Sequence, residues 1–306
     1  MNVLVASTLD SNPFLTVPQL AALLHINEKK VYQLAGDGEL PGTKITGKWI
    51  FPRRLIEDWI TENCHSGVLN DRLIVTGSDD RLIHRVFNRY SAEVQNNALV
   101  SYSPCGTRHG LRMLDIRRAD ACFINWGASD QDARRHLGLL RSYKNHSDWV
   151  VLRGLQRQQG LIVSSPLAST HSTPLGLLSD RTLTWALRNE DSGNNRLLLD
   201  TCSEHEIDLN KLKEGARCNS ERGAVAAVCK GVVDVTCGAK SSASEFNLGF
   251  IPLASVSLDL VTNKQTYFRT LLQHLIIRLQ HNDAQPLADD LGGYSVPNTL
   301  ELITLG

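Results

Sequence analysis

Apolar residues repeat at helical spacing in two short stretches near the start of the chain. The first is VPQLAALL, with Thr16 before it as the expected N-cap. The second is NEKKVYQLAG, which Asn27 can cap and which ends at a glycine. Two short helices joined by about two residues form a helix-turn-helix.

The pattern then changes from helical to extended. Lys44 and Lys48 stand on either side of Gly47 in TKITGKWIF, which predicts a tight hairpin, and Pro52 ends its second strand. Apolar residues return at helical spacing in RRLIEDWI. The order helix, turn, helix, wing, helix predicts a small winged helix-turn-helix domain over residues 1–63.

Polar and basic residues gather where such a domain meets DNA. The start of the second helix usually reaches base edges, whereas basic residues of the wing contact phosphates. Residues 41–54 contain no acidic side chain. The predicted DNA-binding residues are Asn27, Lys29, Lys30, Tyr32, Gln33, Lys44, Lys48 and Arg53. The alternatives are an ordinary solvated face and a helix-turn-helix that binds protein.

The order and spacing of these pieces resemble a known family. The chain contains LTVPQLAALL, GELPGTK, GKWIFPR and LIEDWI in succession over nearly fifty residues, and this stretch is similar to the excisionase-type, MerR-related winged helix-turn-helix domain. The resemblance implies that double-stranded DNA is a partner.

A segment of linker composition, CHSGVLND at residues 64–71, follows this domain. Beyond it, apolar runs alternate with helical stretches, from RLIVTGSDD and RLIHRVFNRY through NALVSYSPCG and LRMLDIRRAD to ACFINW. This alternation predicts a βαβαβ unit and a parallel sheet, so residues 72–306 form an α/β domain. The tail from His281 is expected to wrap the first half of that domain.

This second part resembles the type-2 periplasmic-binding-protein fold in its regulator-fused form, which is related to molybdate-binding proteins. The likeness rests on TGSDD, CGTRHGLRML, RRADACFINW, QQGLIV, NEDSGNNRLLLD and ERGAVAAVCKGVVDV followed by LGFIPLASVSLDLV. It implies two lobes around a cleft, lobe I over about 72–160 and 258–306 and lobe II over about 161–257. The hinge is expected where two extended segments, 159–161 and 258–260, lie side by side.

Four turns between an extended stretch and a helix carry the candidate ligand site. At a helix start, unpaired backbone N–H groups and the positive end of the dipole favour an anion. In the two-lobed fold such turns line the cleft. The predicted ligand-binding residues are Ser78, Asp79, Gly106, Thr107, Arg108, Trp126, Ser192, Gly193, Asn194 and Arg222. Helix capping alone explains a Ser or Asp at such a position equally well.

The class of effector stays open between two kinds of anion. The likeness to molybdate-binding proteins implies an oxyanion such as molybdate or tungstate. Asn194 and Asn195 depart from the Gly-Thr-like continuation expected in relatives, and a bare tetrahedral oxyanion needs neither Trp126 nor a fixed Arg108 guanidinium. A small organic anion is therefore the rival, and neither a cofactor nor a metal is expected.

Composition narrows the remaining classes of protein. Lys+Arg 32 equal Asp+Glu 32, so DNA binding must come from a local patch. The seven cysteines show no zinc-site spacing, and Cys237 is expected to be a buried apolar side chain rather than a redox thiol. The start lacks a signal-peptide pattern, and no run approaches the roughly 20 apolar residues of a membrane helix, which predicts a cytoplasmic protein without membrane contact.

Motifs of catalysis do not occur in this sequence. We find no nucleophile elbow, zinc-protease helix, P-loop or dinucleotide fingerprint, so no enzyme activity is expected. The prediction is a one-component transcriptional regulator, acting as a homodimer, in which a small anion or polar metabolite modulates operator binding. The rivals are an exported transport protein, a recombination directionality factor with a ligand-binding domain, and an enzyme built on the same fold.

Overall fold

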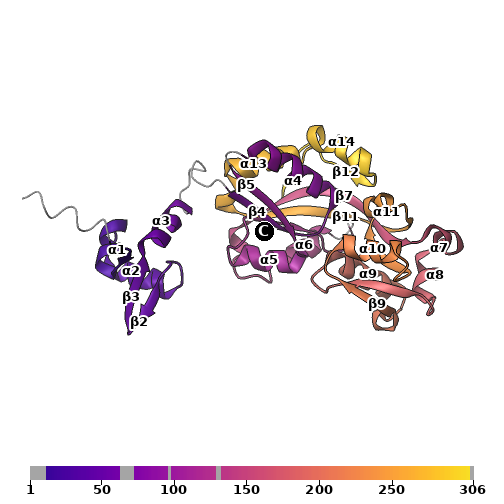
Figure 1. The fold of residues 1–306 in the computed structure, drawn as a ribbon, viewed down its shortest axis with the longest axis horizontal. Helices are drawn as coiled ribbons and strands as arrows, with labels where there is room; N and C mark the ends of the chain where they lie inside the picture. Colours follow the sequence, from indigo (N-terminus) through magenta and orange to yellow (C-terminus); the bar gives the residue numbers. More distant parts are fainter. Residues whose placement is uncertain (1–11, 63–71, 96–97, 129–131, 304–306) are drawn as a thin grey trace, which may run out of the picture. The chain divides into compact units, whose positions relative to one another are not determined.

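The computed structural model describes residues 12–62, 72–95, 98–128 and 132–303. The chain divides into two compact units, residues 1–70 and 71–306 (Figure 1). Each unit has hydrophobic cores of its own. The predicted linker, residues 64–71, lies outside the described residues.

The first unit combines three helices with a small antiparallel sheet. Its elements are β1 (Phe14–Leu15), α1 (Val17–Leu24), α2 (Glu28–Gly36), β2 (Thr43–Ile45), β3 (Lys48–Pro52) and α3 (Arg53–Glu62), and its strands lie in the order β1-β3-β2. Leu20, Val31, Phe51 and Ile56 are each 0% exposed and join α1, α2, β3 and α3 in one core. The predicted order helix, turn, helix, wing, helix is confirmed.

Local chemistry sets the boundaries of these elements. The side chain of Gln19 accepts a hydrogen bond from the backbone N–H of Thr16 at 2.9 Å, and Asn27 Oδ1 accepts one from the N–H of Lys30 at 2.8 Å. The hairpin turns at Thr46 and Gly47, whose φ angles are 49° and 82°. A two-residue turn of type I′ has positive φ at both positions, and glycine supplies it without steric cost. The predicted caps and the turn at Gly47 are confirmed.

A ten-stranded mixed sheet runs through the second unit, with eight strands in the order β5-β4-β6-β11-β7-β10-β8-β9. The strands are β4 (Arg72–Gly77), β5 (Leu99–Pro104), β6 (Ala121–Ile124), β7 (Trp149–Val163), β8 (Thr184–Arg188), β9 (Lys213–Cys218), β10 (Val235–Ala239), β11 (Gly249–Asn263), β12 (Tyr294–Ser295) and β13 (Leu302–Ile303). The pairs β4–β5, β4–β6, β8–β9 and β8–β10 are parallel, as the alternation of strands and helices predicts.

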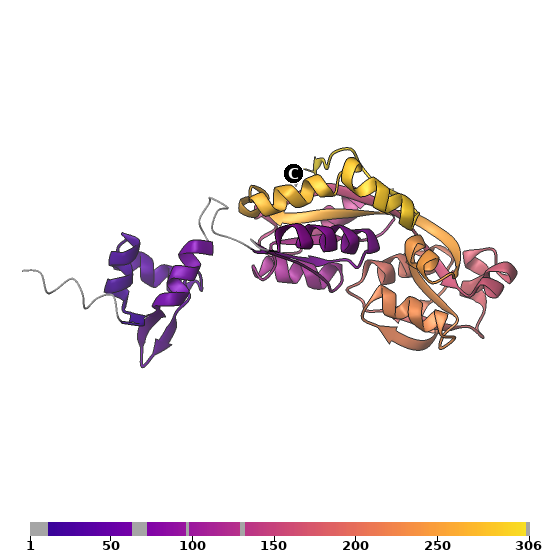
Figure 2. The ribbon, with the colours of Figure 1, turned by 45° about the horizontal axis from the view of Figure 1, so that its top comes forward.

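The helices divide between two lobes that share the long antiparallel strands β7 and β11 (Figure 2). Lobe I contains β4, β5 and β6 with α4 (Arg81–Val94), α5 (Thr107–Asp115), α6 (Asp132–Leu140), α12 (Lys264–Tyr267), α13 (Thr270–Arg278) and α14 (His281–Leu291). Lobe II contains β8, β9 and β10 with α7 (Ser165–Thr170), α8 (Pro174–Ser179), α9 (Gly193–Glu204), α10 (Glu221–Cys229) and α11 (Lys240–Glu245). The predicted two-lobed α/β architecture is confirmed.

The pairing register of β7 with β11 shows where the chain passes from one lobe to the other. Leu155 faces Leu258 within the core of lobe I, and Leu161 faces Ile251 within the core of lobe II. Val256 also belongs to the core of lobe II, so the chain crosses between the lobes at residues 156–160 on β7 and at Ser257 on β11. The expected return to lobe I near residues 258–260 agrees with this. The two expected segments do not face each other, because Gln159 pairs with Ala254 and Leu258 with Leu155, and a strand pattern does not show that register.

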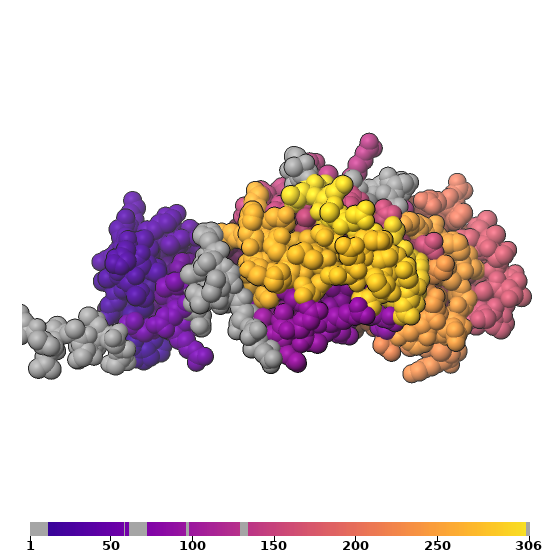
Figure 3. Space-filling view, turned by 90° about the horizontal axis from the view of Figure 1, so that it is seen from above, coloured from indigo at the N-terminus to yellow at the C-terminus, as the bar shows by residue number. Residues whose placement is uncertain are grey.

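The C-terminal segment returns to lobe I. Helix α14 packs on α4, and β12 and β13 pair with β7. In Figure 3 this segment, in yellow, lies beside the purple helix α4. Leu287 and Leu291 of α14 bury their side chains in the core of lobe I. The predicted wrapping of the tail around the first lobe is confirmed.

Candidate functional site

Three turns meet at one small pocket between the lobes. The turns β4–α4 and β5–α5 come from lobe I, and the turn β8–α9 comes from lobe II. The pocket is small, with a volume of about 10 Å³, and is lined by Ser78, Asp79, Gly106, Arg157, Arg188, Ser192, Gly193 and Asn194. This is room for about one water. Because Gly106 and Ser192 are the N-caps of α5 and α9, two helix starts face the pocket.

Six of the ten predicted ligand-binding residues line this pocket, namely Ser78, Asp79, Gly106, Ser192, Gly193 and Asn194. Thr107 lies behind Ser78, with their hydroxyl oxygens 2.8 Å apart, and donates its own proton to the carbonyl of Asn125 at 2.9 Å. Ser78 must then donate to Thr107, so the Ser78 hydroxyl offers the pocket only acceptor lone pairs. Whether these six residues bind a ligand stays a prediction.

The other three predicted residues lie outside the lining of the pocket. Arg108 is exposed, and its guanidinium carbon lies over the ring of Trp126, 4.9 Å from the ring centre. Arg222 has a side chain 61% exposed and lies 3.7 Å from Glu245. Both arginines stand in the first turn of a helix whose start faces the cleft, but their long side chains extend over the surface instead.

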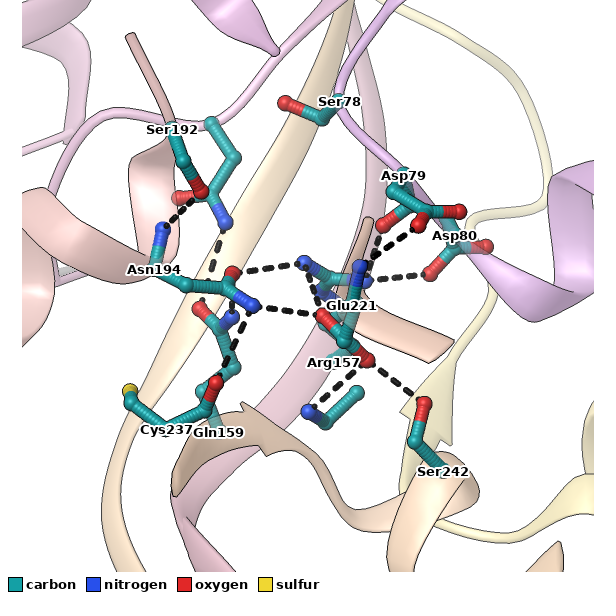
Figure 4. A network of polar contacts seen from close by, with 12 residues as sticks. Ser78, Asp79, Asp80, Arg157, Gln159, Ser192, Asn194, Glu221, Cys237 and Ser242 are labelled. Carbon is teal, nitrogen blue, oxygen red and sulfur yellow. Dashed lines mark hydrogen bonds and ion pairs between the residues drawn. The ribbon is translucent and has the colours of Figure 1, made fainter. Parts of the chain in front are cut away.

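Sequence reasoning missed both arginines of the pocket. Arg157 of β7 has a side chain 1% exposed, and its Nη1 donates to the carbonyl of Asp79 and to Asp80 Oδ2, both at 2.9 Å. Its Nη2 lies 3.7 Å from Glu221 Oε2. Burial by itself would lower the pKa of Arg157, but the charges of Glu221 and Asp80 outweigh it and raise that pKa. Arg157 therefore stays charged and joins both lobes to the hinge strand (Figure 4).

Asn194 is the centre of the polar network in Figure 4. Its Nδ2 donates to Glu221 Oε2 at 2.7 Å and to the carbonyl of Cys237 at 3.3 Å. Its Oδ1 accepts from Arg157 Nη2 at 3.4 Å and from the amide of Gln159. Both donors and both lone pairs of this side-chain amide are then in use. In this arrangement the side chain of Asn194 positions other groups, and its backbone N–H donates to Ser192 Oγ at 3.2 Å.

Arg188, the last residue of β8, is buried without an ion-pair partner. It is 5% exposed, and its Nε and Nη2 donate to the carbonyls of Cys218 and Asn219 at 3.2 and 3.0 Å. Among the described residues, no carboxylate lies within ion-pairing distance of its guanidinium, and Nη1 makes no hydrogen bond. Burial lowers the pKa of Arg188, although Glu221 and Asp79 act in the opposite direction. The pocket thus presents a cation with a free donor.

Two other groups near the pocket have shifted pKa values. Burial raises the pKa of Asp79, but hydrogen bonds from His84 and from the backbone N–H of Glu221, together with the charge of Arg188, outweigh it and hold that pKa below its usual value. Burial raises the pKa of the Cys237 thiol to about 12, and this residue is 3% exposed. The expectation of a buried, unreactive Cys237 is confirmed.

The predicted DNA-binding residues lie on the surface of the first unit. All are exposed except Arg53, which is half-buried and donates from Nε to the carbonyl of Asn12 at 3.3 Å. Tyr32 on α2 and Ile45 on the wing are each 52% exposed and stand among the basic residues. The second helix and the wing thus combine exposed cations with exposed apolar groups. Which of them contact DNA stays a prediction.

In the part of the chain that the structure describes, no helix is both long and apolar enough to cross a membrane. The same residues contain no group of three or more His, Cys, Asp or Glu side chains placed to hold a metal ion.

Family models account for most of the chain. A helix-turn-helix domain model matches residues 14–64, and a PBP superfamily domain model matches residues 89–280, more than half of the chain. The chain belongs to the PBP superfamily. The matched residues run from α4 to α13 and include Gly106, Arg157, Arg188 and the β8–α9 turn of the pocket, whereas Ser78 and Asp79 precede the match. The helix-turn-helix domain lies N-terminal to them.

Solved structures share the fold of the PBP superfamily domain. The tungstate ABC transporter from Geobacter sulfurreducens has 13% identity and a TM-score of 0.53, covering 72% of this chain and 98% of that chain. An H2O2-bound mutant of OxyR from Corynebacterium glutamicum has 16% identity and a TM-score of 0.52, covering 93% of each chain. At such identities the likeness shows the fold alone. No curated protein matches the chain.

Proposed function

We propose that this chain is a ligand-responsive transcriptional regulator. Its helix-turn-helix unit binds a double-stranded DNA operator, and a small anion in the pocket between the lobes modulates that binding. The pairing of a helix-turn-helix domain with a PBP superfamily domain supports the two halves of this proposal. Arg188 supports the choice of an anion.

The charge of Arg188 favours an anion in the pocket. A buried charge is costly unless it is paired, and Arg188 has only carbonyl partners. An anion placed among Arg188, the start of α5 and the start of α9 would receive a charged donor and two groups of backbone N–H dipoles. Strand β8, helix α5 and helix α9 would therefore each contribute a group that stabilises a bound anion.

The size and the charges of the pocket narrow the class of anion. Arg108 and Trp126 stand outside its lining, so the pocket favours a compact anion over a large aromatic one. Asp79 and Glu221 act on Arg188, and their negative charges oppose a second charge on the ligand. A singly charged organic anion such as acetate therefore suits the charges of the pocket better than the doubly charged molybdate and tungstate. Each of these anions needs more room than the pocket offers in this arrangement, so binding would require the lobes to separate slightly.

The experiment is calorimetric titration of the full-length chain with molybdate, tungstate, sulfate and acetate. Arg188→Met removes the charged donor and keeps the length of the side chain, so a bound anion should lose about 1.5–3 kcal/mol, a tenfold to hundredfold weaker affinity. The control is Arg181→Met in lobe II, because Arg181 is exposed, does not line the pocket, and donates from Nη1 to the carbonyl of Lys211 at 3.1 Å. This control should bind as the unmodified chain does.

DNA binding is measured on the same variants with an operator selected from random duplexes. The anion that binds the pocket should change the affinity of the unmodified chain for this operator, and Arg188→Met should remove the response. A chain that binds none of the four anions at millimolar concentration contradicts the choice of an anion. An anion response that survives in Arg188→Met places the site elsewhere.

The proposal includes a homodimer. One winged helix-turn-helix makes a small interface with DNA, so two copies on a two-fold-related site would supply the affinity of a specific regulator. The half-sites should then lie about one helical turn, or a multiple of it, apart. Analytical ultracentrifugation of the complex tests this, and one chain bound to a site without repeats would contradict it.

A further inference from the structure

Three ion pairs cross from lobe I to lobe II outside the pocket. Arg81 Nη2 lies 2.6 Å from Glu245 Oε1. Arg112 makes two contacts with the carboxylate of Asp191, at 3.3 and 2.5 Å. Arg135 pairs with Asp200. Helices α4, α5 and α6 of lobe I thus each supply an arginine to a carboxylate of lobe II.

The charges of these pairs are sorted by lobe. In all three, the cation comes from lobe I and the anion from lobe II. Apart from the pairs of Arg157 on the hinge strand, other ion pairs stay within one lobe, such as Arg85 with Asp290 in lobe I and Arg217 with Glu214 in lobe II. Within lobe II, Asp200 also pairs with Arg196 and Glu245 with Arg222. Since opposite signs face each other at these three places, the pairs attract the two lobes to each other in the closed arrangement.

Backbone contacts also join the two lobes along this boundary. The N–H of Arg108 donates to the carbonyl of Asp191 at 3.2 Å, and the N–H of Glu221 donates to Asp79 Oδ2 at 2.9 Å. A Cβ on Gly193 would lie 2.2 Å from the carbonyl oxygen of Asn125, so the two lobes approach as closely as a glycine allows. Opening the cleft would break these contacts together with the three ion pairs.

We propose that the pairs Arg81–Glu245, Arg112–Asp191 and Arg135–Asp200 form a rim latch that keeps the cleft closed without a ligand. The carboxylates and arginines of the latch are partly exposed, with side chains 12–48% accessible. Salt screens such pairs, because the Debye length falls from about 10 Å at 0.1 M salt to about 3 Å at 1 M. Cleft opening is therefore controlled by ionic strength, whichever ligand the pocket takes.

The test measures the distance between the lobes in the full-length chain. Two ketone-bearing residues replace Ile116 and Val232, which are 59% and 63% exposed, and carry spin labels that leave the native cysteines unmodified. Ile116 follows α5 and Val232 follows α10, and both helices begin at the cleft and run away from it. Opening should lengthen the distance between the labels, read by double electron–electron resonance.

Charge reversal and its rescue give the decisive comparison. Arg112→Asp places two carboxylates together, so the long-distance population should rise severalfold at 0.1 M salt. The double variant Arg112→Asp, Asp191→Arg restores the opposite charges and should return the short distance. The matched control is Arg85→Asp, because its partner Asp290 lies in the same lobe. In the unmodified chain, 1 M salt should raise the long-distance population as Arg112→Asp does.

Several results would overturn the latch. One is a distribution of distances that is the same in Arg112→Asp as in the unmodified chain and the same at low and high salt. Another is a double variant that remains as open as Arg112→Asp, which would mean that Arg112 acts through something other than its charge. Circular dichroism of each variant reports folding, and the swapped variant keeps the test valid if the single reversal unfolds. None of these readings depends on a ligand, so they can fail independently of the proposed function.

Discussion

Replacing Asp80 by asparagine is expected to destabilise the second unit strongly. The Asp80 side chain is 0% exposed, and its Oδ2 accepts from Arg157 Nη1 and from the hydroxyl of Tyr294, both at 2.9 Å. Its Oδ1 accepts from the N–H of Ile83 and so caps α4. An asparagine can keep the cap, but its amide nitrogen then faces two donors, and Arg157 loses its closest carboxylate.

The loss of stability arises because Arg157 keeps its buried charge but loses one of its two carboxylate partners. Breaking a buried ion pair from one side costs about 3–5 kcal/mol, and for a unit of this size each kcal/mol lowers Tm by about 2–4 °C. We therefore expect Asp80→Asn to lower the Tm of the second unit by about 6–20 °C, measured by calorimetry of the full-length chain. The control Asp290→Asn breaks a pair with Arg85 whose side chains are 65% and 40% exposed, and it should cost at most about 1 kcal/mol. Equal losses for both variants would refute the reasoning that burial sets the cost.

Three other changes have defined outcomes. The pKa of Asp79 is lower in the folded chain than its unfolded value of about 3.9, so its contribution to stability is complete above that value and is lost as pH falls through the folded pKa. Asp79→Asn should reduce this loss of folding stability at low pH, measured by urea unfolding at several pH values. An unchanged dependence of stability on pH would exclude Asp79 as its source. Lys48→Ala should reduce the slope of log affinity for DNA against log salt by about one, measured by anisotropy, whereas an unchanged slope would place Lys48 away from the phosphates. Gly193→Ala should lengthen the distance between the lobes, because its Cβ would lie 2.2 Å from the Asn125 carbonyl oxygen; a short distance in this variant would show that the backbone yields instead.

The first unit could be predicted because its signals are local. Thr16 and Asn27 mark two helix starts, and Gly47 marks a turn that needs positive φ. Each of these signals acts within three residues of chain, so the sequence alone contains it. The starts of α5 and α9, at Gly106 and Ser192, were found for the same reason.

Arg157 and Arg188 were missed because their burial depends on distant partners. Arg157 is buried by Asp80, 77 residues earlier, and by Glu221 of the other lobe. A signal was nevertheless present: the polar run QRQQ in β7 lies between apolar runs, and a strand that is apolar at both ends and polar at its centre indicates a polar interior. Arg188 ends an apolar run, TWAL, which by itself is equally typical of a strand that stops at the surface.

The buried charges of the hinge region are better explained by geometry than by stability. A buried ion-pair network is often no more stable than apolar side chains of the same volume, so Arg157, Asp80 and Glu221 add little as a source of folding energy. Asp80 belongs to lobe I, Glu221 belongs to lobe II, and Arg157 stands on the strand between them. Their network is complete only when the lobes are closed, because opening separates the carboxylate of Glu221 from Arg157, which keeps Asp80 as its partner. Such an arrangement makes partly open angles between the lobes unfavourable and favours one closed geometry. The proposed ligand response requires two distinct states of this kind.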